Sequence, residues 1–509
     1  MSTTLNLESS TTFYTTIQAR IRTFLSANDY IERKIPLVSS PRSSAAASSS
    51  PGDNDDATST KQEQEQEQQQ PTFANRALLI SSFTDGVAPA AAPAQQFLKT
   101  SLISTLANDA LEQVEEHVES SAVQSPCCGP DMEAVAVMEE LQDALLDLNQ
   151  SERAAESTAE LISNKGDLLE GILQHVSASY GIVGDTDDDD DTDDARSRAS
   201  SSDAGEDHSA SAPAATTAPP VTVRLLYIPT AMYALRADST STPGKQRQRA
   251  RYDAKQRRKQ LEELLYDMLN EHTGSTTPTT TAAFEGADPA SATNNDSSSA
   301  AAASVSVNVL AVTLDLDDGS IKQPFGSDEP SDFPKDGEEA LTDWSPHMIY
   351  VEGGNTFWLH HCMTKGDWAD KIVAACSGPS GAVYCGKSAG AIIAGKHVET
   401  ATWKQMDDPS VVPGMEEYED WAGVSGLSLC GDLSIFPHMA SKWEDLVEEK
   451  QKDIDDSAVL LTDWDVCCIS GDTKEATFIG IESSTNPEVA GSNPSVTDGG
   501  SANTDLVQA

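Results

Sequence analysis

Ser388 lies in the sequence pattern of this chain that is best suited to covalent chemistry. Residues 381–395 read GAVYCGKSAGAIIAG, so an apolar run ends at Cys385, a G-x-S-x-G turn follows, and a run of small residues begins at once. This strand–turn–helix context is typical of a nucleophile elbow, which exposes the serine oxygen at the carboxyl edge of a sheet. We expect Gly386 and Gly390 to be required, because side chains in so sharp a turn would collide with neighbouring backbone.

Two backbone amides are candidate donors to the oxyanion that such a serine would create. Ala389 begins the predicted helix, whose N-terminus favours negative charge. Residues 348–362 read MIYVEGGNTFWLHHC, and a strand that runs into two glycines lets the Gly354 amide approach the nucleophile. Asn355 and Thr356 are candidate substrate contacts. The alternative is an ordinary strand-to-helix turn in which one of them is the N-cap.

A base and an acid are predicted at the same edge of the sheet. His438, in LSIFPHM, comes just past the end of a strand on a turn that contains proline, so we expect it to be the base for Ser388. Asp463, in VLLTDWDVCC, also follows an apolar strand and is predicted to orient the imidazole, with Asp465 as a hydrogen-bonding neighbour. Asp408, in QMDDPS, is the alternative acid.

The elements that must position these residues alternate between strand and helix. Apolar runs of strand length separated by helical patterns indicate βαβ units, and therefore an α/β fold with a mostly parallel sheet flanked by helices. The predicted strands are 77–82, 223–228, 305–314, 347–351, 382–385, 434–436 and 458–461, followed by a hairpin of 466–470 and 476–479. The predicted helices are 95–118, 133–148, 152–177, 251–270, 356–364, 367–376, 389–395 and 441–453.

Composition limits how much of the 509-residue chain can fold. Hydrophobic residues make up 38% of it, and several stretches of Ser, Ala, Gln, Thr, Pro or Asp cannot bury enough apolar surface to offset the entropy lost on ordering. We therefore expect one α/β hydrolase domain over 73–480, with low-complexity insertions at 185–220 and 273–304. A disordered N-terminal region over 1–72 and a disordered tail over 481–509 would flank it.

Charge and hydropathy exclude some partners. The 33 basic and 82 acidic residues give a net charge of −49, which argues against a nucleic-acid partner, since phosphate binding needs a basic face. No run of 18 apolar residues occurs, so no membrane span is expected. The eight cysteines form no C-x-x-C pair, which favours an intracellular, cytoplasmic protein without a zinc site. Residues 1–34 are compatible with an organelle transit peptide.

Five segments, taken in order, resemble the aspartyl dipeptidase (dipeptidase E) family of serine peptidases, with the cyanophycinases as more distant relatives. They are GGNTF, the G-x-S-A-G-A elbow, the Asp-Asp-Pro loop, the Pro-His pair that ends a strand, and a later strand that ends in an acid followed by Trp. The match is close over 345–480 and weaker at 73–84 and 221–235. The resemblance implies a sheet like that of class I glutamine amidotransferases and a peptidase that cleaves small peptides after an N-terminal aspartate.

The resemblance also implies roles for individual residues. Ser388 matches the nucleophile, His438 the base and Asp463 the acidic third member of the triad. Gly354 and Ala389 match the oxyanion donors. Such a mechanism acts on a small peptide and needs neither a metal nor another cofactor. The sequence gives no indication of the oligomeric state.

Two departures from the family pattern concern substrate recognition. Lys387 stands where bacterial dipeptidases usually carry Trp, which places a candidate substrate-binding cation beside the nucleophile. The family recognises the substrate aspartate through an arginine downstream of the histidine, whereas this chain has no arginine after Arg258. Lys442, Lys450 or Lys452 could replace it, although an ammonium lacks the bidentate fork of arginine. The sequence therefore supports hydrolysis more strongly than aspartyl specificity.

Two other function classes compete with this interpretation. An esterase of the α/β-hydrolase type would use Ser388, Asp408 and His438 in that order, but it normally takes its oxyanion donor from a loop several units before the elbow. Here the glycine pair lies only one βα unit before it. A non-catalytic scaffold would act through its acidic and Gln-rich tracts. The presence of a serine, a histidine and an acid at suitable positions argues against a scaffold.

Overall fold

The structure is a computed structural model that describes part of the 509-residue chain. The described residues are 30–37, 74–82, 92–124, 131–154, 166–184, 219–236, 239–270, 305–322, 333–452, 454, 458–471 and 473–481. The expected insertion at 273–304, nearly all of the one at 185–220, and the expected tail beyond residue 481 lie outside them. So do residues 1–29, which include most of the expected transit peptide.

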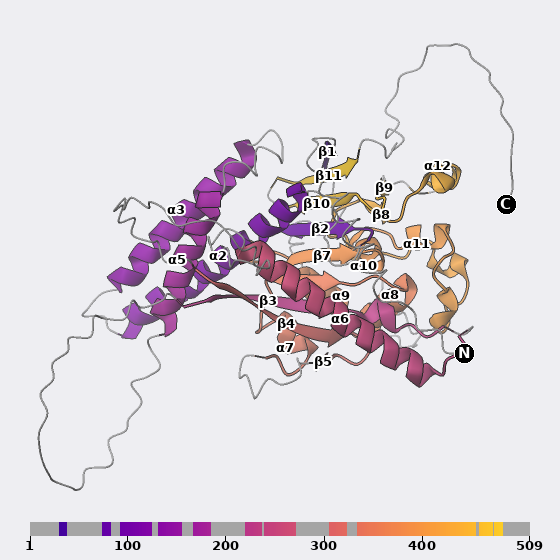
Figure 1. The fold of residues 1–509 in the computed structure, drawn as a ribbon, viewed down its shortest axis with the longest axis horizontal. Helices are drawn as coiled ribbons and strands as arrows, with labels where there is room; N and C mark the ends of the chain where they lie inside the picture. Colours follow the sequence, from indigo (N-terminus) through magenta and orange to yellow (C-terminus); the bar gives the residue numbers. More distant parts are fainter. Residues whose placement is uncertain are drawn as a thin grey trace, which may run out of the picture.

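A nine-stranded mixed sheet forms the centre of the molecule (Figure 1). Its strands are β1 (Tyr30–Pro36), β2 (Arg76–Ile80), β3 (Val221–Ile228), β4 (Val307–Asp315), β5 (Ser320–Lys322), β6 (Met348–Val351), β7 (Val383–Lys387), β10 (Val466–Ser470) and β11 (Glu475–Ile481). They lie in the order β1-β11-β10-β2-β7-β6-β3-β4-β5. The central run from β2 to β4 is parallel, and the pairs toward both edges are antiparallel. This confirms the predicted α/β fold.

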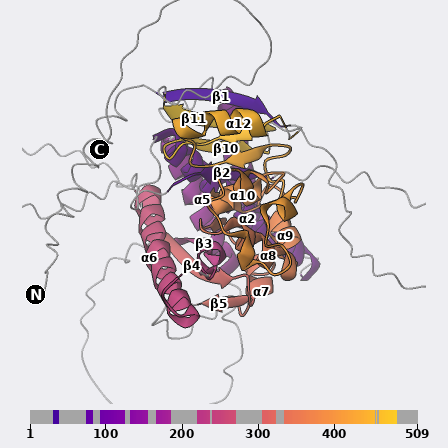
Figure 2. The same ribbon diagram turned by 90° about the vertical axis from the view of Figure 1, so that its right-hand side faces the viewer.

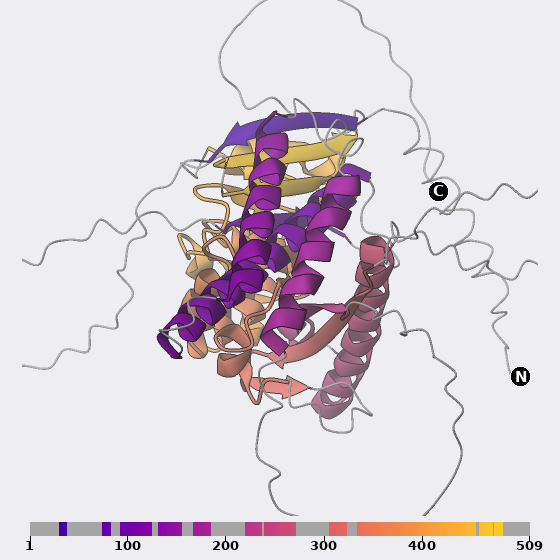
Figure 3. The ribbon, with the colours of Figure 1, turned by 90° about the vertical axis from the view of Figure 1, so that its left-hand side faces the viewer.

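Helices cover both faces of this sheet, which explains why its central strands are apolar throughout. One face is covered by α2 (Ala92–Gln124), α5 (Gly166–Gly184) and α6 (Pro243–Asn270), and α3 (Met132–Ala154) packs against α2 and α5; this side of the sheet faces the viewer in Figure 3. The other is covered by α7 (Gly337–Leu341), α8 (Thr356–Lys365), α9 (Trp368–Ala375) and α10 (Ala389–Ala394), all labelled in Figure 2. Successive residues of a strand point to opposite faces of the sheet, and each face packs against its helices in a hydrophobic core. Tyr350 and Cys385 therefore face α2 and α6, whereas Ile349 and Tyr384 face α8 and α10.

A smaller layer follows α10 and carries part of the candidate site. It contains α11 (Thr400–Trp403), η2 (Pro409–Val411), η3 (Tyr418–Trp421), β8 (Ser434–Phe436), η4 (Ser441–Trp443), α12 (Glu444–Lys450) and β9 (Ala458–Leu460). Strands β8 and β9 pair in parallel as a separate two-stranded sheet. Trp403, Phe436 and Leu460 belong to a third hydrophobic cluster here, which fixes these strands against α11. One more turn, η1 (Thr230–Tyr233), follows β3.

The structure differs from the sequence expectations at three elements. Residues 30–36 were expected to be part of a disordered N-terminal region, but they form β1, which pairs antiparallel with β11. This pairing covers what would otherwise be an open sheet edge. Strand β5 was not predicted. Of the helix expected over 152–177, residues 152–154 belong to α3 and residues 166–177 to α5, and residues 155–165 lie outside the described ranges. Among the described helices, none combines the length and the apolarity needed to cross a bilayer.

Candidate active site

Ser388 sits in a strained turn between β7 and α10. Its backbone angles are φ 48° and ψ −106°, a conformation that residues other than glycine rarely adopt, and its N–H donates to the Ile80 carbonyl over 2.8 Å. A Cβ atom on Gly386 would lie 2.6 Å from the Gly390 oxygen, and one on Gly390 would lie 2.3 Å from the Val351 oxygen. Both glycines are therefore required by close backbone contacts, and the turn is held against two neighbouring strands.

One imidazole contacts both a serine and a carboxylate. Nε2 of His438 lies 2.9 Å from Ser388 Oγ, and Nδ1 lies 2.6 Å from Asp463 Oδ1. An ionised carboxylate can only accept hydrogen bonds, so Nδ1 donates to Asp463 and Nε2 is left to accept the serine proton. The hydrogen bond from His438 is the main cause that lowers the pKa of Asp463 below its usual value. The three side chains thus have the connectivity of a nucleophile, a base and an orienting acid.

Contacts from three elements hold the turn that carries His438. This residue also has a positive φ, 54°. Its N–H donates to Ser81 Oγ over 3.0 Å, and the Ser81 hydroxyl donates to the Leu461 carbonyl over 2.8 Å. The Lys404 ammonium donates to the carbonyls of Pro437 and His438. The imidazole is therefore fixed from the ends of β2 and β9 and from the residue that follows α11.

The glycine pair after β6 runs directly beside the nucleophile. A Cβ atom on Gly353 would lie 3.0 Å from Ser388 Cβ. Gly354 has φ 151°, and a Cβ atom there would lie 2.4 Å from the carbonyl carbon and oxygen of Ala231. Ala389 is the first residue of α10, so its N–H has no acceptor within its own helix. The amides of Gly354 and Ala389 are thus on the two segments that flank Ser388.

Asn355 and Thr356 connect helix α8 to the loop that contains two aspartates. Asn355 is the N-cap of α8, because its side chain accepts from Trp358 N over 2.9 Å, and its Nδ2 donates to the Asp408 carbonyl over 3.0 Å. The Thr356 N–H donates to Asp407 Oδ2 over 2.8 Å. The structure therefore gives these two residues capping and loop-anchoring contacts, which was the alternative interpretation of the sequence.

The other candidate acids do not contact His438. The Asp408 carboxylate accepts from the amide and the hydroxyl of Ser410, at 3.0 and 2.6 Å, and so caps η2. Asp465 Oδ2 accepts from the Thr462 amide over 2.8 Å and stabilises the turn that carries Asp463. Of the acids considered from the sequence, the structure brings Asp463 to the imidazole.

This geometry lies within a segment that matches a known family. The model of peptidase family S51 matches residues 332–468. Residues 332–468 belong to this family. They include Ser388, His438 and Asp463. The match confirms the resemblance to the dipeptidase E family. The chain is thus a serine-type peptidase.

The chain was also compared with solved structures and with curated proteins. A solved structure from Listeria monocytogenes EGD-e, provisionally assigned as a peptidase E protein, is 17% identical, with 49% of this chain and 82% of that chain covered and a TM-score of 0.26. Among curated proteins no match was found.

In this S51 segment Lys387 is not a free cation. Only 8% of the residue is exposed, and its ammonium lies 2.5 Å from Oε1 of Glu352, which is 2% exposed. Burial lowers the pKa of Lys387, while Glu352 opposes that shift. The expectation of a substrate-binding ammonium at this position is therefore not met. Sequence reasoning missed Glu352. The signal that could have found it is an acid directly after one predicted strand and a lysine just after the next.

Two other lysines lie close to the triad. Lys404 was also missed by sequence reasoning, and burial lowers its pKa to about 8, against the opposing effect of Asp463 and Asp407. Lys442, on η4, is exposed, and its Nζ lies 4.8 Å from the centroid of the Trp443 ring. Among the described residues, Lys442 is thus an exposed cation four positions after His438.

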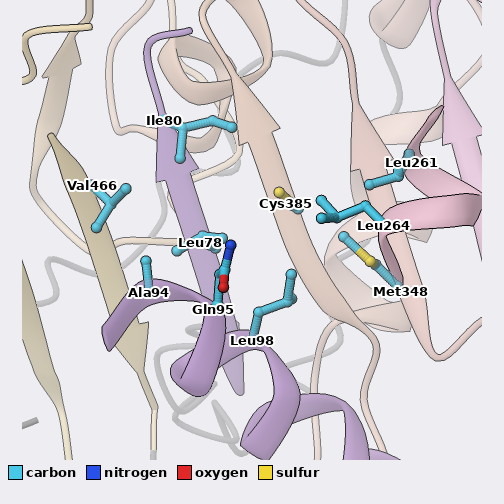
Figure 4. A pocket seen from close by; sticks show the side chains of 10 residues that line it. All are labelled: Leu78, Ile80, Ala94, Gln95, Leu98, Leu261, Leu264, Met348, Cys385 and Val466. Atoms are coloured by element: carbon cyan, nitrogen blue, oxygen red, sulfur yellow. The ribbon is translucent and has the colours of Figure 1, made fainter. Parts of the chain in front are cut away.

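An apolar cavity of the same molecule lies away from this chemistry. It is enclosed by β2, β6 and β7 on one side and by α2 and α6 on the other (Figure 4). Leu78, Leu98, Met348 and Cys385 are among the residues that line it (Figure 4), and Ser388 is not. Within the described ranges, no three His, Cys, Asp or Glu side chains are grouped so that they could hold a metal ion.

Proposed function

We propose that Ser388, His438 and Asp463 form the catalytic triad of this serine peptidase, and that its substrates are small peptides with an N-terminal aspartate. The observation that carries the proposal is the position of one imidazole, 2.9 Å from the serine oxygen and 2.6 Å from the carboxylate. Nucleophile, base and orienting acid must be connected in this order for acyl transfer.

The proposed reaction proceeds through an acyl-enzyme. His438 Nε2 takes the Ser388 proton while Oγ forms a bond to the scissile carbonyl carbon. The amides of Gly354 and Ala389 stabilise the oxyanion. The C–N bond then breaks as Nε2 returns the proton to the departing amine. Water, deprotonated by the same imidazole, attacks the ester, and the carboxylic acid product leaves with the serine hydroxyl restored.

We base the preference for an N-terminal aspartate on Lys442, one of the three lysines named from the sequence as replacements for the missing arginine, and not on Lys387. Because Lys387 is occupied by Glu352, it cannot also receive a substrate carboxylate. Lys442 is exposed and follows His438 by one short turn. The site itself is open, since the side chains of His438 and Asp463 are 36% and 52% exposed. We assign to Lys442 the contact with the carboxylate of the substrate side chain.

Two measurements on the purified full chain test this proposal. A fluorophosphonate probe should label the wild-type protein and the Ser377→Ala control, whose hydroxyl donates to Val373 O at the end of α9, but not Ser388→Ala. A dipeptide screen should show faster hydrolysis of Asp-X than of Glu-X, Arg-X or neutral peptides, and Ser388→Ala should lower kcat roughly 10⁴-fold.

Three results would contradict the proposal. Activity on p-nitrophenyl esters with none on any peptide would favour the esterase. Absence of labelling in the folded protein would favour the scaffold. Near-normal turnover by Ser388→Ala would exclude this serine as the nucleophile.

A further inference from the structure

We infer that the buried ion pair of Lys387 and Glu352 is a positioning device that holds the oxyanion loop against the nucleophile. This inference rests on the proposed function, because it concerns the same reaction. Glu352 directly follows β6 and directly precedes Gly353, while Lys387 ends β7 and directly precedes Ser388. Strands β6 and β7 are parallel neighbours with Val351 opposite Gly386. The pair therefore bridges the two strands one residue before Ser388 and two residues before Gly354.

The Glu352 carboxylate receives donors from four directions. Its Oε1 accepts from Lys387 Nζ at 2.5 Å, from Arg257 Nη1 at 3.0 Å and from the Gly353 amide at 3.1 Å. Its Oε2 accepts from the Tyr227 hydroxyl at 3.0 Å. A buried carboxylate with two cations and two neutral donors has a fixed rotamer, because any rotation would break several charge-assisted hydrogen bonds at once.

One of these hydrogen bonds sets the direction of the oxyanion loop. Because the Gly353 N–H is turned toward the Glu352 side chain, the first amide of the loop is occupied. The next amide, that of Gly354, is then the one presented to the reaction. Gly354 is confined on its other side by the Ala231 carbonyl group, at 2.4 Å from an added Cβ position. The loop is thus fixed between the carboxylate and the backbone of η1.

Stability alone does not account for a pair of this kind. A buried ion pair costs so much desolvation that apolar residues of similar volume often stabilise a protein equally well. What apolar residues could not supply is an acceptor for the Gly353 amide. Lys387 supplies a charge-assisted hydrogen bond that holds the Glu352 carboxylate in place, and the same lysine is covalently adjacent to Ser388. The pair therefore connects the position of the nucleophile to that of the oxyanion donor.

The test uses Glu352→Gln, Lys387→Met and the double variant of the full chain. Each single variant should lower kcat about 10-fold to 100-fold, a loss smaller than that of a deleted oxyanion donor, while KM changes less than about threefold. The rate constant for fluorophosphonate labelling should fall by the same factor. The double variant should lose less than the product of the two single losses, because a lone partner leaves an uncompensated buried charge.

Two further variants separate positioning from stability. Glu152→Gln breaks a comparably buried pair, Arg76 with Glu152 at 3.1 Å, far from the sheet edge that carries Ser388, and should lower thermal stability without changing kcat. Tyr227→Phe removes only the hydroxyl donor to Glu352, so it should remain folded and should lower kcat about threefold to tenfold.

The outcomes distinguish this inference from the proposed function. If the wild-type protein is labelled and active but Glu352→Gln and Tyr227→Phe keep kcat within twofold, the inference is wrong and the triad stands. If the wild-type protein is neither labelled nor active on any peptide, the proposed function fails and the inference fails with it.

Discussion

Asp463 Oδ1 lies 2.6 Å from His438 Nδ1, although the two residues are 25 positions apart in the chain. The reason is the parallel pairing of β8 and β9, in which Phe436 lies opposite Leu460. Parallel strands end at the same edge, so the loops that follow them are brought together. Met439 N also donates to Leu461 O over 2.8 Å, which extends the pairing up to the two side chains. The acid is therefore placed by the strand pair that also places the base.

We expect Asp463→Asn to lower kcat by roughly 10²-fold to 10⁴-fold, because an amide can hold the imidazole in the wrong tautomer. Asp408→Asn is the matched control, since Asn is as good an N-cap as Asp and should keep the contact with Ser410. Steady-state kinetics on the best dipeptide would measure both. A larger loss for Asp408→Asn than for Asp463→Asn would overturn the assignment.

The three residues of the candidate triad could be predicted because each follows an apolar strand. Ser388, His438 and Asp463 come just after β7, β8 and β9, and the parallel pairing of β8 with β9 brings the last two together. Strands β8 and β9 form a separate sheet, and the end of β2 joins them to Ser388, since Ile80 O accepts from Ser388 N and Ser81 Oγ accepts from His438 N. The choice between Asp463 and Asp408 was left open by the sequence, because each lies in a loop after the nucleophile. Only the register of β8 against β9 and the contact of Asp408 with Ser410 distinguish them.

The burial of Lys387 and the presence of strand β1 could not be predicted from the sequence, because both depend on contacts between distant segments. Lys387 is paired with Glu352, the residue after β6, and Glu352 is also paired with Arg257 of α6, which lies 95 positions before it in the chain. A lysine beside a nucleophile therefore looked exposed when considered alone. Strand β1 was missed for the same reason, since its partner β11 lies at the other end of the chain and the segment YIERKIP contains three charged residues.

Gly354→Ala should lower kcat about 10²-fold to 10³-fold, the loss expected for one oxyanion donor. The added methyl group would lie 2.4 Å from the Ala231 carbonyl group and would displace the loop. Gly378→Ala is the matched control, because Gly378 also has a positive φ, 82°, but a Cβ atom there meets nothing within 4 Å. If both variants lose the same activity, backbone strain rather than the oxyanion loop is responsible.

Lys442→Met should raise KM for Asp-X dipeptides about fivefold, the size of one exposed ion pair of about 1 kcal/mol, and leave Ala-X dipeptides unchanged. Lys452→Met is the control, because that exposed lysine is already paired with Glu448 at 3.7 Å. The ratio of kcat/KM for Asp-X and Ala-X should fall in the first variant only. An unchanged ratio would show that another group receives the substrate carboxylate.

A buried histidine outside the candidate site should make the stability of the fold depend on pH. His347 lies at the opposite edge of the sheet from Ser388, with Nδ1 accepting from Arg224 N at 3.0 Å and Nε2 donating to Asp109 Oδ2 at 3.1 Å. Burial lowers the pKa of His347, the hydrogen bond with Asp109 opposes this shift, and the Arg224 charge adds to it. The folded state therefore keeps this imidazole neutral at a pH where the unfolded chain takes up a proton.

The sign of the effect follows from proton uptake. Above the ordinary histidine pKa of about 6.5 both states are neutral and His347 contributes no pH dependence. Below it the unfolded state binds the additional proton, so the free energy of unfolding falls by up to about 1.4 kcal/mol per pH unit. Urea unfolding at pH 7.5 and 5.5 should show a larger difference in the wild-type protein than in His347→Gln, in which this proton uptake is removed. Equal differences in the two proteins would mean that His347 takes up its proton in the folded state as readily as in the unfolded one.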